Sequence, residues 1–253
     1  MIDLHSDIVH AIIKKRITLE DYMKIEKNHT IVYTLFNPQE VDDPINYFKD
    51  LLRIKTKIEE IKPKSRFSIE NISCPKIFEK ILNLKKIEYL SLCHNYSNEY
   101  CDSSTDKEKN NGLSQAGREV VKLANTNNIK IDISHASEKS ALDIIRISTL
   151  PVIASHSNCN AITRNSRNLT NNIINGIKEI GGIIGLTFLP KCLGGSDPML
   201  IKNHIIYLLK IGMKNIGIGS DFYGGGIILD YDYVEEIISN SKITTINSMR
   251  FLL

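Results

Sequence analysis

The sequence lacks three features that would point to common classes of partner or scaffold. Its formal net charge is only +3 over 253 residues, and the lysines are scattered, so neither nucleic acid nor an anionic membrane is indicated as a partner. No apolar run approaches the roughly 18 residues that a membrane span needs. The five cysteines include no Cys-x-x-Cys pair, which argues against a disulfide framework or a zinc knuckle and makes a reducing cytoplasm the expected compartment.

Several catalytic and binding motifs are missing as well. The absence of His-Glu-x-x-His and of Gly-x-Ser-x-Gly excludes the helix-borne metalloproteases and the usual esterase elbow. Three successive glycines at 224–226 complete neither a dinucleotide fingerprint nor a phosphate loop, and are interpreted as a flexible loop. No secretory leader is visible, because the first residues already have charge and strand character. We therefore expect an unprocessed chain.

The chain does contain a regular alternation of short apolar runs and longer amphipathic ones, which is typical of β-α units. Its 253 residues suit one domain covering 1–253. Strands are expected at 1–4, 30–36, 66–69, 89–93, 129–134, 151–155, 182–188 and 215–220. Helices are expected at 43–61, 117–125, 139–147 and 173–180, with Gly117 as a candidate helix start. The polar stretch 98–111 is predicted to be an exposed loop.

Eight strands with helices between most of them favour a closed (β/α)8 barrel over an open doubly wound sheet. Barrel active sites are built at the C-terminal ends of several strands at once. Histidines and carboxylates recur at those positions: they are His5, Asp7, Glu70, His135 and His156. In a barrel these strand-end residues would lie close together, so they could form one site.

The five strand-end residues are more specific as a set than one by one. His5 and Asp7 are two residues apart on an extended segment, so both side chains point to the same side and can reach one cation. Glu70 can place one oxygen on each of two metals, although a lone carboxylate there is more often a helix cap. Each Ser-His pair, ending in His135 and His156, could be an ordinary structural histidine. Together they match the ligand types of zinc and predict a two-metal hydrolase.

Other polar groups suit roles beside the metals. His94 can donate to a developing oxyanion, with a metal ligand or a supporting residue as the alternative. Asp221 can move a proton to the leaving nitrogen, or instead orient a ligand histidine. Arg164 and Arg167 lie in the loop after His156 and can hold a substrate carboxylate, or lie on the surface.

Many segments in this order resemble the membrane (renal) dipeptidase family, the M19 peptidases. The resemblance covers most of the chain and is carried by these segments: Ile2-Asp-Leu-His-Ser-Asp, Ser68-Ile-Glu, Leu92-Cys-His-Asn-Tyr-Ser-Asn, Gly112-Leu-Ser-Gln-Ala-Gly, Ile131-Asp-Ile-Ser-His-Ala-Ser, Pro151-Val-Ile-Ala-Ser-His-Ser-Asn, Arg167-Asn-Leu-Thr, Gly181-Gly-Ile-Ile-Gly, Gly217-Ile-Gly-Ser-Asp-Phe and Asn247-Ser-Met-Arg.

The resemblance implies a barrel with two zinc ions that hydrolyses dipeptides, including some with a D-residue at the C-terminal side. One zinc would be held by His5 and Asp7, the other by His135 and His156, and Glu70 would bridge them. The family's substrate-contacting histidine and arginine would correspond to His94 and Arg167, and its catalytic acid/base to Asp221. In the expected mechanism a bridging hydroxide attacks the peptide carbonyl.

The sequence also departs from the family pattern. Asn71 stands where a glycine is usual, and asparagine tolerates positive φ better than most residues. Tyr223 replaces a second acid, and Leu189 stands near the position of a substrate-binding tyrosine. The segments before Glu70 and after Gly224 look shorter than usual. These departures affect the expected substrate preference more than the expected metals.

Two alternatives stay open. One is a barrel metallohydrolase acting on another amide, a lactam or a phosphoester, although such enzymes typically begin with His-x-His and use a carboxylated lysine. The other is an inactive metal- or ligand-binding relative. The expected partner is a small dipeptide, with no nucleic acid and no membrane, and a homodimer is one option for the assembly.

Overall fold

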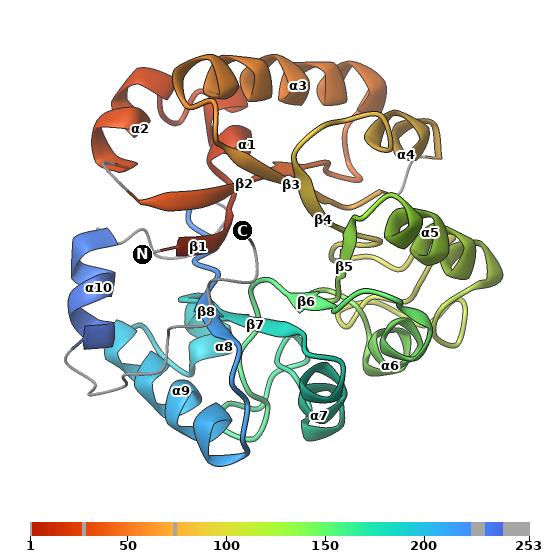
Figure 1. Ribbon diagram of the computed structural model, residues 1–253, viewed down its shortest axis with the longest axis vertical. Coiled ribbons are helices and arrows are strands. Elements are labelled where there is room, and N and C mark those ends of the chain that lie inside the picture. The colour runs from red at the N-terminus through yellow and green to blue at the C-terminus, as the bar shows by residue number, and fades with distance from the viewer. Residues whose placement is uncertain (1, 27–28, 73–74, 224–230, 240–253) are drawn as a thin grey trace.

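The computed structural model describes residues 2–26, 29–72, 75–223 and 231–239. Eight parallel strands form a closed barrel in sequence order, β1 to β8, and helices surround it (Figure 1). The strands are β1 (Ile2–Ser6), β2 (Thr30–Phe36), β3 (Arg66–Glu70), β4 (Ile87–Ser91), β5 (Lys130–Asp132), β6 (Ile153–Ala154), β7 (Ile183–Leu186) and β8 (Ile216–Ile218). The expected (β/α)8 fold is confirmed, with shorter strands than expected at β5, β6, β7 and β8.

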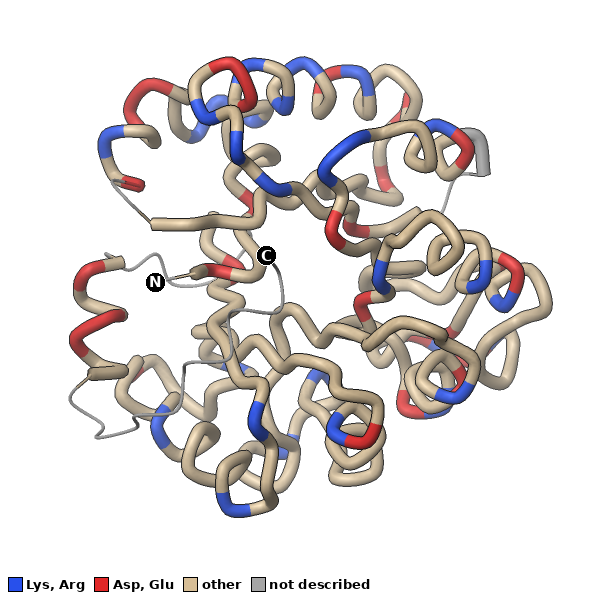
Figure 2. Tube along the Cα trace, in the orientation of Figure 1, with Lys and Arg blue, Asp and Glu red and all other residues tan. Residues whose placement is uncertain are grey.

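The helices lie on the outside of the barrel. They are α1 (Ile8–Ile13), α2 (Leu19–Glu26), α3 (Pro44–Ile61), α4 (Pro75–Ile81), α5 (Gln115–Thr126), α6 (Glu138–Ile147), α7 (Asn171–Glu179), α8 (Pro190–Leu193), the 3-10 helix η1 (Pro198–Leu200), α9 (Ile201–Lys210) and α10 (Tyr231–Ser239). Acidic and basic residues are spread over these outer helices, mixed along α3 and only acidic along α10 (Figure 2). Within the described ranges, no helix combines the length and the apolar character needed to cross a membrane.

Capping residues fix where the helices begin. Asp43 caps α3 by accepting a hydrogen bond from the backbone N–H of Asn46, and proline follows at the first turn. Ser114 caps α5 in the same way, and the helix begins at Gln115, so the expected start at Gly117 is wrong by two residues. Gly117 has a different role, because a Cβ there would lie 2.2 Å from the carbonyl oxygen of Tyr100. Its lack of a side chain lets the 98–111 stretch pack against α5.

The 98–111 stretch is only in part the exposed loop that its composition predicts, because 104–111 is intermediate or exposed but most of 98–103 is buried. Tyr100, Cys101, Asp102 and Ser103 are buried. The carboxylate of Asp102 accepts backbone N–H groups at 109, 110 and 112, which turns a polar sequence into a compact loop. Polar composition misled the prediction, because the loop satisfies its buried polar groups internally.

Two hydrophobic layers hold the barrel. The larger one lies between the sheet and the helices. The smaller one fills the barrel interior and consists of Leu4, Val32, Tyr89, Ile153 and Ile183. Leu4 occupies the centre, where a Cβ on Gly217 would come within 2.9 Å of its Cδ1.

Candidate metal centre

Every residue that the sequence predicts as a metal ligand lies at the C-terminal end of the barrel. His5 is in β1, Asp7 follows it, and Glu70 is the last residue of β3. His135 and His156 follow β5 and β6. All five are buried to at least 94%, with Asp7 the most accessible at 6%. The structure thus brings the five predicted ligands into one buried cluster.

The first half of the cluster surrounds Nε2 of His5. This atom lies 3.6 Å from Oδ1 of Asp7 and 3.6 Å from Oε2 of Glu70. Asp7 occupies the N-cap of α1, but its side chain makes no capping hydrogen bond. Its carboxylate is therefore available to a ligand. Oδ1 of Asp221 lies 4.0 Å from the same histidine nitrogen and completes this side.

The second half surrounds the other oxygen of Glu70. Oε1 lies 3.0 Å from Nε2 of His135 and 3.6 Å from Nε2 of His156. The two histidine nitrogens are 3.0 Å apart. The two oxygens of Glu70 therefore face two different sets of nitrogens, which is the arrangement a bridging carboxylate requires.

The cluster fits cations by two observations. Four of its buried atoms have no hydrogen-bond partner in the described structure: His5 Nε2, Asp7 Oδ1, Glu70 Oε1 and His135 Nδ1. Buried polar atoms are nearly always satisfied, so such a concentration calls for a ligand. Donors at about 2.0–2.1 Å from a tetrahedral zinc lie roughly 3.3 Å from one another. The measured 3.0–3.6 Å between donor atoms agrees with that spacing.

The pKa values of the histidines are shifted in opposite directions in the two halves of the cluster. Burial lowers the pKa of both His135 and His156 well below the usual value, and positive charge on Arg167 and His5 lowers it further. Both imidazoles are therefore neutral and have a lone pair for a metal. Burial also acts to lower the pKa of His5, but Tyr89 and Glu70 outweigh it and raise the pKa well above the usual value. Excess negative charge on that side favours a bound cation.

Three further predicted residues line a cavity of about 280 Å³ over this cluster. His94, Arg167 and Asp221 face it, and its lining also includes Asp7, His10, Phe36, Asn95, His135, Leu189 and Lys191. Arg167 is 4% exposed, and its Nη1 has no hydrogen-bond partner in the described structure. A buried guanidinium that faces a cavity is suited to an anionic group of a small ligand.

Asp221 and His94 have shifted pKa values. Burial raises the pKa of Asp221 well above its usual value, and the charge on Asp7 raises it further. Burial lowers the pKa of His94, whose ring lies 4.2 Å from that of His135. A nitrogen of His94 is also close enough to Glu70 and His135 to share a metal with them. Both roles that the sequence leaves open for His94 are therefore compatible with its position.

Local backbone geometry supports two of these positions. Asn71 has φ of +69°, as expected for a residue that replaces glycine after Glu70, and its side-chain amide donates to the carbonyl of Asn37. Asp221 has φ of +57°, and its backbone N–H donates to the carbonyl of His5. That bond joins the end of β1 to the segment after β8. It places the two parts of the candidate site side by side.

Sequence reasoning missed the residues that support the ligands. Asp132 and Ser155 form a hydrogen-bonded group behind the histidines. Asp3 accepts from the backbone N–H groups of His5 and Ser220. A recognisable pattern was present, since an aspartate lies two residues before His5 and three before His135. Of the two arginines weighed from the sequence, Arg164 is exposed and only Arg167 lines the cavity.

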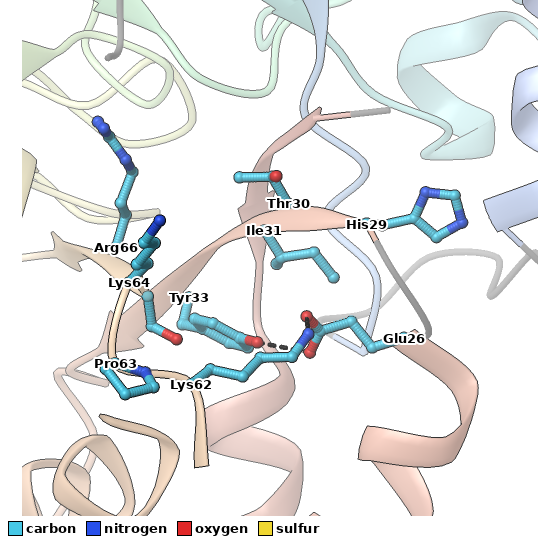
Figure 3. Close-up of a pocket in the computed structure, with 10 residues that line it drawn as sticks. Glu26, His29, Thr30, Ile31, Tyr33, Lys62, Pro63, Lys64 and Arg66 are labelled. Atoms are coloured by element: carbon cyan, nitrogen blue, oxygen red, sulfur yellow. Dashed lines mark hydrogen bonds and ion pairs between the residues drawn. The ribbon is translucent and has the colours of Figure 1, made fainter. Parts of the chain in front are cut away.

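A larger cavity of about 410 Å³ lies at the opposite end of the barrel, beside the N-terminal ends of β2 and β3 (Figure 3). Its most buried ionisable group is Glu26. Tyr33 donates a 2.5 Å hydrogen bond to that carboxylate, and Lys62 forms an ion pair with it. Arg66 pairs with Glu88. The charges of this cavity are partnered, since His29 also pairs with Asp232 and Glu235. Among the described residues, the groups that could hold a metal all lie at the other end of the barrel, so size does not identify the functional site.

The fold and the cluster define a (β/α)8 barrel protein with a candidate binuclear metal centre. The profile of the membrane dipeptidase family (Peptidase family M19) matches residues 77–238. The chain belongs to this family. The three glycines at 224–226, interpreted from the sequence as a flexible loop, and the segment beginning Asn247, which contributes to the resemblance, lie outside the described residues.

Curated relatives and solved structures agree with this assignment. Dipeptidase tcpJ from Claviceps purpurea is 34% identical over 152 residues, which are 57% of this chain and 36% of that protein. Dipeptidase ataJ from Aspergillus terreus is 32% identical over 164 residues, which are 54% of this chain and 40% of that protein. This chain thus matches well under half the length of these two relatives.

Two solved structures share the fold across nearly the whole chain. A metallopeptidase from Rhodobacter sphaeroides, liganded with a phosphinate mimic of the dipeptide L-Ala-D-Ala, has a TM-score of 0.79 at 18% identity. It covers 94% of this chain and 91% of its own. Dipeptidase AC of family M19 has a TM-score of 0.80 at 17% identity, covering 95% and 92%. At such low identity the likeness establishes the barrel.

Proposed function

We propose that this chain is a metallo-dipeptidase that hydrolyses the peptide bond of dipeptides at a centre of two zinc ions. The observation that carries the proposal is the division of Glu70 between the two histidine sets, with Oε2 facing His5 and Oε1 facing His135 and His156. One zinc would be held by His5, Asp7 and Glu70, and the other by Glu70, His135 and His156. When bound, such ions lower the pKa of an attacking water and polarise a carbonyl.

The chain's own residues provide the proton transfer. Asp221 faces the cavity beside the cluster, and burial raises its pKa well above the usual value, which favours its protonated form. A carboxyl group in that state can give the proton to the nitrogen that leaves when the peptide bond breaks. His94 is neutral because burial lowers its pKa, and its ring N–H can donate to the oxygen that becomes negative during attack.

Substrate length would be set by Arg167. Its guanidinium is buried, has an unpaired Nη1 in the described structure and lines the same cavity as Asp221. A dipeptide has its free carboxylate one residue from the scissile bond. An arginine that lines the cavity over the metal cluster can bind that carboxylate, and this favours dipeptides over longer chains. The phosphinate bound to the Rhodobacter sphaeroides relative mimics L-Ala-D-Ala. It supports including dipeptides with a D-residue at the C-terminal side among the substrates.

The experiment is a release assay with zinc-loaded protein on a matched panel of L-L and L-D dipeptides. The proposal expects turnover of at least one dipeptide, little turnover of the corresponding tripeptides, and none with Glu70→Gln. Amides, lactams and phosphoesters in the same assay test the alternative of another barrel metallohydrolase. Binding of two zinc ions without turnover of any of these substrates would instead support an inactive relative. A cytoplasmic location stays a prediction, which cell fractionation tests.

A further inference from the structure

One hydroxyl group contacts histidines from both halves of the candidate metal centre. Oγ of Ser155 lies 3.1 Å from Nδ1 of His5 and 2.8 Å from Nδ1 of His156. The same oxygen lies 2.5 Å from Oδ2 of Asp132. Ser155 is fully buried, so these contacts are not shared with solvent. The two histidines belong to different halves of the cluster, and this serine is common to both.

The direction of each hydrogen bond follows from counting protons. A hydroxyl has one proton to donate and two lone pairs to accept with. The carboxylate of Asp132 can only accept, so the proton of Ser155 lies on the short bond to Oδ2. Oγ of Ser134 lies 3.2 Å from the same oxygen, but it donates its own proton to Oδ1 of Asp132 at 2.6 Å and has none for Ser155. The contacts with His5 and His156 must then be accepted by the serine oxygen. It follows that His5 and His156 each have their proton on Nδ1.

The second neighbour of His5 gives the same answer. The hydroxyl of Tyr89 lies 3.2 Å from Nδ1 of His5, but it donates its own proton to the carbonyl of Leu4 at 2.5 Å. A carbonyl cannot donate, so Tyr89 can only accept from His5. Two independent partners therefore require a proton on Nδ1 of His5, which leaves Nε2 as the nitrogen that can bind a metal. Nε2 is the atom that faces Glu70 in both histidines.

Asp132 is itself fixed by its surroundings. Its Oδ1 accepts from the backbone N–H of Ser134, from the hydroxyl of Ser134 and from the backbone N–H of Ser155. Oδ2 is thereby left for the hydroxyl of Ser155. These bonds connect the ends of β5 and β6, which pair only through Asp132 and Ile153. A charged acceptor held this firmly strengthens the serine bond and keeps its direction.

The backbone of Ser155 is also held in place. A Cβ on Gly185 would lie 2.0 Å from the carbonyl oxygen of Ser155, and a Cβ on Gly219 would lie 1.6 Å from it. Neither position could have a side chain without moving this peptide. Two glycines at the ends of β7 and β8 thus form a slot for one carbonyl group. Asp132 at the end of β5 and the two glycines together fix the position of Ser155.

We propose that Ser155, anchored by Asp132, is a positioning residue that fixes the tautomer of one histidine ligand in each half of the metal centre at once. This inference rests on the proposed two-metal function. Its consequence is that the two metal sites are not independent, because removing one hydroxyl leaves both Nδ1 atoms without that acceptor. Substitutions that disturb a histidine ligand through its outer hydrogen bond typically weaken metal binding about 10–100-fold.

The test compares Ser155→Ala with Ser134→Ala, since the hydroxyl of Ser134 also bonds Asp132 but its only histidine contact is to the backbone N–H of His156. Zinc binding is measured by calorimetry, and the imidazole tautomers by ¹⁵N NMR. His204 is the internal reference, because it accepts at Nδ1 from the backbone of Cys159 and donates from Nε2 to the carbonyl of Leu193. His204 therefore has its proton on Nε2, and its signals mark this tautomer in the same spectrum.

We expect the wild type to show Nδ1–H for His5 and His156 in the zinc form, with Nε2–H for His204. Ser155→Ala is expected to weaken both zinc sites about 10–100-fold and to change the ¹⁵N signals of both ligand histidines while His204 keeps its own. The zinc affinity of Ser134→Ala should stay within about threefold of that of the wild type. Equal zinc affinity of Ser155→Ala and wild type overturns the inference, as does an Nε2–H form of either ligand histidine in the wild type.

The two proposals fail in different ways. If the wild type binds no zinc, the proposed function is overturned, and with it the role of Ser155 toward metals. If the wild type binds two zinc ions and Ser155→Ala weakens only one of them, the proposed function stands and the shared role is overturned. If Ser155→Ala does not fold, the tautomers of the wild-type zinc form decide the inference.

Discussion

Two glutamates are buried at opposite ends of this barrel, and their surroundings differ. Glu26 is 1% exposed at the N-terminal end, where Tyr33 donates to its carboxylate and Lys62 pairs with it. Glu70 is 2% exposed at the C-terminal end, and its Oε1 has no hydrogen-bond partner within the described structure. Both carboxylates are buried, but among the described residues only Glu26 has a lysine beside it to compensate its charge.

The comparison shows that burial of a charged group does not by itself mark a functional site. The larger cavity lies beside Glu26, and the smaller one lies over the Glu70 cluster. A buried carboxylate with a cationic partner is a structural solution to desolvation. Oε1 of Glu70 faces His135 and His156, whose lowered pKa values keep them neutral, so this oxygen has no cationic partner until a metal ion binds. Replacing glutamate by glutamine should therefore reduce turnover at Glu70 and reduce only stability at Glu26.

The largest expected effect is on turnover, in Glu70→Gln. An amide cannot bridge two cations with charged oxygens, so the variant loses the stabilisation that a metal centre gives to a developing charge. That stabilisation is several kcal/mol, which corresponds to a loss of roughly 10³-fold or more in kcat/KM. Steady-state kinetics on the best dipeptide of the panel measure it. Turnover within tenfold of the wild type would contradict the assignment of the bridge.

Arg167→Ala is expected to have the next largest effect. Loss of a charge-assisted contact to the free carboxylate costs about 1.5–3 kcal/mol, or roughly 10–150-fold in kcat/KM. A dipeptide whose C-terminus is an amide should be hydrolysed slowly by the wild type and no more slowly by the variant. The matched control is Arg164→Ala, because Arg164 is exposed in the same loop. Equal losses for both arginines would exclude the proposed carboxylate contact.

Zinc should stabilise the folded chain, and this effect should separate the two glutamates. Free zinc at about 100 times its dissociation constant adds roughly 2.7 kcal/mol, which raises the melting temperature of a chain of this size by roughly 5–10 °C. Thermal unfolding with and without zinc measures the shift. It should persist in Glu26→Gln and be much smaller in Glu70→Gln. A shift that disappears in Glu26→Gln would place the metal at the wrong end of the barrel.

The smallest expected effect is a change of stability without a change of turnover, in Glu26→Gln. The substitution removes the charge that Lys62 pairs with, and the side chain of Lys62 is 31% exposed, so water screens part of the loss. A decrease of about 1–3 kcal/mol in the free energy of unfolding is expected. Denaturant unfolding measures it on zinc-free protein. Turnover at saturating zinc should stay within about twofold, and a larger loss would couple the two ends.

The sequence predicted the barrel because apolar runs followed by helical patterns recur along most of the chain. Bounds were less well predicted for β6, which contains only Ile153 and Ala154 although the apolar run suggested 151–155. Helices α1, α2, α4, α8, α9 and α10 lay outside the expected ranges. The short helix α1 follows β1 without a turn signal of the usual kind, since Asp7 occupies its N-cap without a side-chain cap bond.

The candidate ligands were predictable because parallel strands end at one edge, so strand-end residues converge whatever the exact register. The supporting residues were not. Asp132 and Ser155 are 23 positions apart, and their hydrogen bond depends on the pairing of Asp132 with Ile153 between β5 and β6. An aspartate and a serine in such segments look like ordinary strand and turn residues. Only the three-dimensional arrangement shows that one hydroxyl contacts two histidines.

The most direct test of the central claim is anomalous X-ray diffraction at the zinc absorption edge, on crystals grown with zinc. The account predicts two anomalous peaks, one on each side of the Glu70 carboxylate, the first against His5 and Asp7 and the second against His135 and His156. A single peak at the cluster, no peak there, or occupancy only beside Glu26 would contradict it.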